Sequence, residues 1–143
     1  MKGRSIAVLA ILLIALASTT SFEARQTGIV TEGGCGCHGG MTSNTVITVD
    51  GLPDVFNASE EYLFTLTITN DNVPVENPDQ NGGFSMILTG GGVLESVPDI
   101  DGNTASEMDG GLTHNLDIND RRTWDFKWTA PADDTAIASF LIF

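Results

Sequence analysis

Apolar and polar residues alternate along much of the chain beyond residue 44, and this alternation predicts its structure. In residues 61–70, Tyr62, Phe64, Leu66 and Ile68 fall on one face and three threonines fall on the other. Successive side chains of a strand point to opposite faces of its sheet, so the segment is predicted to be a strand buried on one side. No part of the chain after its first 24 residues repeats with the period of an amphipathic helix.

Five further segments have the same period of two. The pattern therefore predicts six strands, at 45–49, 61–70, 83–89, 93–97, 123–129 and 136–143. The segments 71–82 and 98–115, rich in turn-forming and acidic residues, are predicted to be loops. Six short strands separated by turns are typical of an all-β, antiparallel β-sandwich, which would occupy residues 44–143.

The segment 123–129 is predicted to be the central strand, because both tryptophans of the chain lie on one of its faces. Large aromatic side chains bury more apolar area than any others. The predicted core consists of Trp124, Phe126, Trp128, Phe64 and Phe84.

Residues 1–24 have the pattern of a signal peptide and its cleavage region. Lys2 and Arg4 precede an unbroken apolar run at 6–17, which ends in Ala-Leu-Ala. The run is shorter than the ~20 residues that a membrane-spanning helix requires. The mature protein is therefore predicted to be secreted or otherwise extracytoplasmic.

The charge of the chain narrows the choice of partners. Its 143 residues carry a net charge of −13, from 6 basic and 19 acidic residues. Nucleic acids and anionic membrane surfaces are recognised first through lysine and arginine, so neither is expected as a partner. The length corresponds to a single domain after a leader.

A glycine-rich arm at 25–43 carries the most reactive side chains of the chain. Cys35, Cys37 and His38 stand in the run Gly-Gly-Cys-Gly-Cys-His-Gly-Gly, and we call these three residues the cysteine knot. Two thiolates and an imidazole suit copper or zinc, with His114 as a fourth ligand. A disulfide between the two cysteines is the alternative without a metal.

Covalent haem is the third interpretation of the cysteine knot. The attachment signature of c-type haem is C-x-x-C-H, and this chain has one residue fewer between its cysteines. A six-coordinate haem also needs a second axial ligand. The candidates are His114, Met41, Met86 and Met108.

A weaker candidate site is the acidic segment around Asp99, Asp101 and Asn103. It places oxygen ligands at alternate positions, as a calcium site requires, with Glu107 and Asp109 nearby. An ordinary acidic turn has the same composition.

The ordered set of motifs resembles the prokaryotic reeler-like secreted domains, also called choice-of-anchor V domains. The resemblance is carried by the cysteine knot and by Trp-x-Phe-x-Trp-x-Ala-Pro at 124–131. It implies an exported, immunoglobulin-like β-sandwich, usually tethered to the cell by a C-terminal tail, which would be its only link to a membrane. Many members carry C-x-x-C-H at the knot, and members continue past the strand at 136–143 to a last strand.

The last segment also bears on partners. Ile142 and Phe143 form an apolar strand end, and such an end invites pairing with another strand. We therefore expect either that a partner strand pairs at the C-terminus or that the sequence is a fragment.

The function predicted from the sequence is that of a secreted or cell-surface binding or structural module without catalysis, whose ligand the sequence does not identify. No serine–histidine–aspartate arrangement with a nucleophile elbow and no phosphate-binding loop is present in the sequence. The alternative is an extracytoplasmic redox protein that carries a metal or haem at the cysteine knot.

Overall fold

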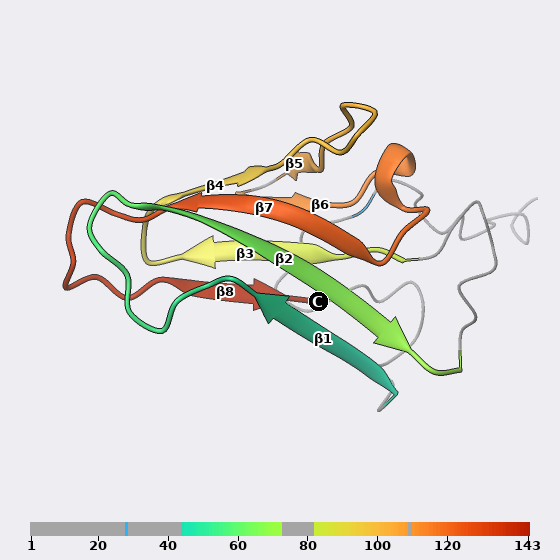
Figure 1. Ribbon diagram of the computed structural model, residues 1–143, viewed down its shortest axis with the longest axis horizontal. Helices are drawn as coiled ribbons and strands as arrows, with labels where there is room; N and C mark the ends of the chain where they lie inside the picture. The colour runs from blue at the N-terminus through green and yellow to red at the C-terminus, as the bar shows by residue number, and fades with distance from the viewer. Residues whose placement is uncertain (1–27, 29–43, 73–81, 109) are drawn as a thin grey trace, which may run out of the picture.

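A computed structural model describes residues 28, 44–72, 82–108 and 110–143 of the chain, and this part is almost entirely β (Figure 1). Its elements are β1 (Thr45–Asp50), β2 (Glu61–Asn70), β3 (Ser85–Thr89), β4 (Val93–Ser96), β5 (Ser106–Met108), β6 (Gly111–Thr113), the 3-10 helix η2 (Leu116–Ile118), β7 (Thr123–Thr129) and β8 (Ser139–Ile142).

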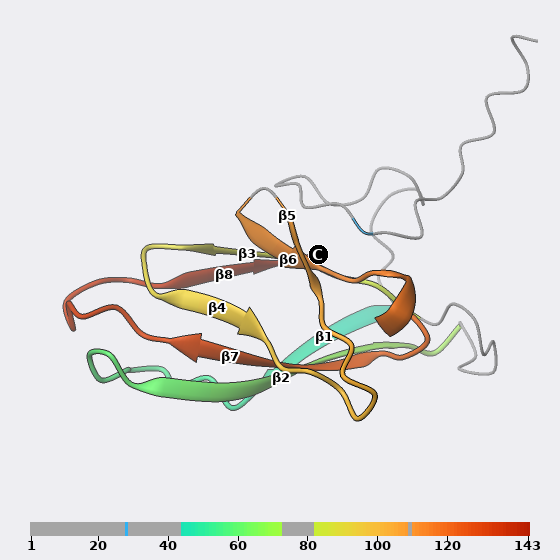
Figure 2. The same cartoon turned by 90° about the horizontal axis from the view of Figure 1, so that it is seen from above.

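The strands form two four-stranded antiparallel sheets that pack as a β-sandwich, without closing into a barrel. One sheet has the order β1-β2-β7-β4 and the other has the order β5-β6-β3-β8. Figure 2 shows the two layers, with β3 and β8 in one and β2 and β7 in the other. The predicted fold class, an all-β antiparallel sandwich, is confirmed.

The core lies between the layers and is centred on β7. Phe126 is fully buried, and its ring stacks on Phe64 at 5.4 Å and meets the edge of Phe84 at 5.3 Å. Antiparallel pairing places Phe64 opposite Phe126 and Leu66 opposite Trp124 on the inner face. From the facing sheet, Phe140 of β8 contacts both Phe64 and Trp128. All five residues assigned to the core from sequence are buried: Trp124, Phe126, Trp128, Phe64 and Phe84.

The observed bounds match β2 and β7 and differ elsewhere. The last observed strand, β8, is shorter than the predicted segment 136–143, because the residues before Ser139 belong to the connection from β7. The prediction that 98–115 is a loop is wrong, because this segment contains the β5–β6 hairpin. Each hairpin strand has three residues, which is too short for a period of two to stand out.

The strand order corresponds to that of an immunoglobulin constant domain. Its first sheet has the order A-B-E-D, which β1, β2, β7 and β4 reproduce, and β3 and β8 then take the places of C and F. The β5–β6 hairpin extends the second sheet beside β3. No strand among the described residues pairs with β8 on its other side, where that architecture places G.

Candidate functional site

The cysteine knot of Cys35, Cys37 and His38, with Met41, lies outside the described residues. So does the leader at 1–24, and Gly28 is the one described residue of the arm. Gly28 is buried, and its N–H donates to the carbonyl of His114 at 2.9 Å. Cys35, the first residue of the knot, follows Gly28 by seven positions in the sequence.

His114 follows β6 and is held against the start of β3. The N–H of Phe84 donates to Nδ1 of His114 at 3.0 Å, and the carbonyl of Phe84 lies 3.1 Å from the same atom. That carbonyl already accepts the Thr113 hydroxyl at 2.8 Å, whereas the Phe84 N–H needs an acceptor. Nδ1 accepts from the Phe84 N–H in the tautomer that carries no proton on Nδ1, and it donates to the Phe84 carbonyl in the other.

Glycines make room for this histidine on two sides. A Cβ on Gly83 would lie 2.4 to 2.7 Å from three ring atoms of His114. A Cβ on Gly28 would lie 1.8 Å from the Thr113 hydroxyl and 2.9 Å from Nδ1 of His114. The sequence singles out His114 as a ligand candidate, but only the fold explains why Gly28 and Gly83 surround it.

The other candidate haem ligands lie in different places. Met86 is fully buried in the core between the sheets. Met108 is half-buried at the end of β5, in the hairpin. Within the described part of the chain, neither methionine contacts His114.

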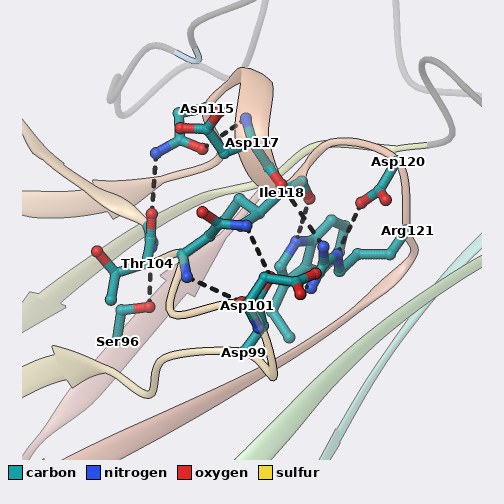
Figure 3. A network of polar contacts seen from close by, with 12 residues as sticks. Ser96, Asp99, Asp101, Thr104, Asn115, Asp117, Ile118, Asp120 and Arg121 are labelled. Carbon is teal, nitrogen blue, oxygen red and sulfur yellow. Dashed lines mark hydrogen bonds and ion pairs between the residues drawn. The ribbon is translucent and has the colours of Figure 1, made fainter.

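Asp99 is the centre of a network of polar contacts that closes its loop (Figure 3). Its Oδ1 accepts the N–H groups of Asp101 at 2.9 Å and of Asn103 at 2.8 Å. Its Oδ2 accepts the Asn103 amide at 3.2 Å and the Arg121 guanidinium at 2.7 Å. Hydrogen bonding, first of all from the Asn103 N–H, lowers the pKa of Asp99 below its ordinary value.

Arg121 connects this loop to the segment before β7. Its Nε donates to Asp120 at 2.8 Å, and this hydrogen bond, followed by that to Asp99, raises the pKa of Arg121. Both carboxylate oxygens of Asp99 are thus engaged with donors, one of them cationic. A calcium ion would have to displace Arg121 in order to use them.

The described residues contain no group of three or more histidine, cysteine, aspartate or glutamate side chains able to hold a metal ion. The calcium proposal for Asp99, Asp101 and Asn103 therefore has only the sequence pattern behind it. The geometry of the loop is that of a hydrogen-bonded turn closed by an ion pair.

An open cleft of about 570 Å³ lies between β4 and the β5–β6 hairpin. Its volume falls within the range of small-molecule and peptide pockets. Several glycines bring backbone to its wall, and leucines and a methionine supply apolar surface. The lining residues are Leu88, Gly91, Gly92, Val93, Leu94, Glu107, Met108, Gly110, Gly111 and Leu112.

The sequence analysis missed this cleft because it missed the hairpin that forms one wall. The signal available was the sequence around Gly110 and Gly111, because Gly110, with φ +82°, immediately precedes the return strand β6. A short glycine turn between Ser106–Met108 and Gly111–Thr113 is a recognised hairpin pattern.

No protein-family model, curated protein or solved structure matches the chain. The resemblance to the reeler-like domains therefore stays a prediction. Within the described ranges, no helix has the length and apolar character needed to cross a membrane.

Proposed function

We propose that this chain is a secreted or cell-surface β-sandwich module that binds a ligand without catalysing a reaction on it. The observation that carries the proposal is the cleft between β4 and the β5–β6 hairpin. It supplies apolar side chains and backbone groups, which bind and orient a ligand, and among the described residues of its lining Glu107 is the only one with an acidic or basic side chain.

The charged side chains of the sandwich support the same proposal, because the ion pairs that the structure describes connect neighbouring strands or close a loop. Lys127 bridges Glu61 at 3.3 Å and Glu95 at 2.9 Å across three strands of the first sheet. Arg121 and Asp99 close their loop, as described above.

The test compares ligand binding by two variants that differ only in which surface is changed. Met108→Glu introduces a charge into the cleft, and Leu63→Glu introduces one on the outer face of β2, where the side chain is 69% exposed. Peptide and glycan arrays probed with the mature protein should give ligands that Met108→Glu loses and Leu63→Glu retains. Recovery of the ligand with an unchanged mass supports binding alone, whereas a converted ligand would make the protein an enzyme.

The proposed location outside the cytoplasm is tested separately, in a bacterial host that expresses the full chain. Export predicts that the mature protein is recovered outside the cytoplasm, with a mass that lacks the leader. An uncut chain in the cytoplasm would contradict it.

A second function is an extracytoplasmic redox protein that carries copper, zinc or haem at the cysteine knot. The hydrogen bond between Gly28 and His114 favours this function, because it holds one residue of the arm beside the histidine of the sandwich. Cys35, Cys37 and His38 would hold the group, with His114 as the further ligand.

Mass spectrometry of the natively purified protein separates the possibilities at the knot. A covalent haem adds its own mass and absorbs visible light, a bound metal is removed by a chelator, and a disulfide lowers the mass by two hydrogens. A mature protein with two free thiols and no bound metal would overturn the redox function.

A further inference from the structure

Glu107 of β5 carries a charge on the inner face of the second sheet. Register places Glu107 opposite Leu112 and Leu112 opposite Met86, and both apolar residues are buried between the layers. Directly opposite residues of antiparallel strands point to the same face of their sheet, so Glu107 also points toward the first sheet. Figure 1 shows β5 on the same edge of the sandwich as β4, and Glu107 lines the cleft between them.

The Glu107 carboxylate forms no ion pair with any of the described residues. The ion pairs that the structure describes involve other carboxylates, and they engage Lys127 and Arg121 outside the cleft. Glu107 is exposed, so solvent and ligands reach its carboxylate through the open cleft. The charge of Glu107 is therefore available to a ligand of opposite sign.

Three leucines give the cleft apolar walls from both layers of the sandwich. Leu94 lies opposite the buried Trp128 in the first sheet, so its side chain projects between the layers. Leu88 lies opposite Phe140 in the second sheet and projects the same way, as does Leu112. A cleft of about 570 Å³ has room for a drug-sized molecule. It therefore offers apolar surface beside a single carboxylate.

We propose that the ligand of this cleft is a small cationic amphiphile, which is a molecule with an apolar body and one ammonium or guanidinium group. The body would lie against the three leucines and Met108, and the cationic group would pair with Glu107. This inference rests on the proposed binding function, because it names the class of ligand that the same cleft takes.

Charge also indicates which ligands the cleft disfavours. The described part of its lining contains no lysine, arginine or histidine, so an anionic ligand would meet Glu107 without any compensating positive charge. The net charge of −13 attracts cations to the entire surface of the chain. The test must therefore separate this general attraction from pairing with Glu107.

The probes are three compounds of similar shape, namely phenylbutylamine, phenylbutanol and phenylbutyrate, which are cationic, neutral and anionic near neutral pH. An NMR titration of the isotope-labelled mature protein gives a dissociation constant for each. We expect phenylbutylamine to bind about two- to fivefold more tightly than phenylbutanol, because the ion pair stays partly exposed to water. Phenylbutyrate should bind more weakly than phenylbutanol, and added salt should reduce the advantage of the amine.

Two glutamate variants provide a matched comparison in the protein. Glu107→Gln and Glu95→Gln remove the same charge, but Glu95 lies opposite Lys127 on the outer face of the first sheet, away from the cleft. Glu107→Gln should bind phenylbutylamine no more tightly than phenylbutanol, whereas Glu95→Gln should keep the preference of the parent. Because Glu107 is exposed and has no ion pair among the described residues, Glu107→Gln should melt at the temperature of the parent.

Met108→Glu separates failure of this inference from failure of the proposed function. It places a charge against the apolar body of the ligand, so it should weaken the binding of all three compounds. Equal dissociation constants for the three compounds, all raised by Met108→Glu, would overturn the inference and leave the cleft as a binding site. The inference is also overturned if phenylbutylamine does not bind. It is overturned as well if Glu95→Gln reduces the preference as much as Glu107→Gln does, because the general charge of the surface then explains that preference.

Discussion

Trp124 and Trp128 are four residues apart in β7 and lie on the same face of the strand, but their indole nitrogens have different environments. Nε1 of Trp124 donates to the carbonyl of Ile118 at 2.8 Å, in a buried hydrogen bond. Nε1 of Trp128 is buried and has no hydrogen-bond partner among the described residues. Replacement of each by phenylalanine therefore removes a satisfied donor in one case and an unsatisfied donor in the other.

The expected difference in stability follows from these environments. Trp124→Phe leaves the buried Ile118 carbonyl unpaired, which costs about 1–3 kcal/mol. Trp128→Phe removes a buried donor whose lack of a partner already costs about 1–3 kcal/mol. The loss of ring area is the same for both and cancels in the comparison. Trp124→Phe should thus be less stable than Trp128→Phe by about 2 kcal/mol or more.

Urea unfolding followed by circular dichroism measures this difference with one probe for both variants. With a slope of about 2 kcal/mol per molar urea, the two midpoints should differ by about 1 M. Equal midpoints, or a lower midpoint for Trp128→Phe, would refute the assigned environments of the two indole groups.

Four further predictions test the core, a turn and the Asp99 loop. Trp124→Ala and Trp128→Ala should each lower the free energy of unfolding by about 3–5 kcal/mol, and variants that unfold like the parent would contradict the core. Gly92→Ala should destabilise more than Gly102→Ala: both glycines have φ near +90°, at +92° and +85°, but only at Gly92 would a Cβ meet other atoms, 2.5 Å from the Thr129 carbonyl. Equal midpoints for these two would show that the close approach is relieved at no cost. Because the pKa of Asp99 is lowered in the folded state, its contribution to stability is present above the unfolded value and is lost as the pH falls through the folded value. Asp99→Asn should therefore be less stable than the parent at pH 7, with a gap that narrows below about pH 4, and a gap of constant size would contradict the cause given for the shift. Millimolar calcium should leave the melting temperature unchanged, because Arg121 and backbone N–H groups already occupy the Asp99 carboxylate, and a rise would show that an ion displaces them.

Much of the sandwich could be predicted because its long strands have one buried face. The bounds of β2 and β7 follow from a period of two that ten and seven residues make plain. The β5–β6 hairpin could not be found in the same way, because three residues per strand leave no pattern that differs from an acidic loop.

The candidate sites were harder to predict, because they depend on contacts between segments that are far apart in the sequence. His114 stands out by residue type, but its contact with Gly28 joins segments that are 86 positions apart, which no local pattern reports.

The pairing of β2 with β7 also bears on how the chain reaches its fold. Thr65 and Asp125 form a hydrogen bond across these neighbouring strands although they are 60 positions apart in the sequence. Closing so long a connection costs entropy before any contact repays it, so the first sheet is expected to form slowly. The aromatic stack cannot assemble on a ribosome until β7 has emerged. The sandwich therefore stays open until β7 has been synthesised, and this late closure would help the proposed export through a translocation channel in an unfolded state.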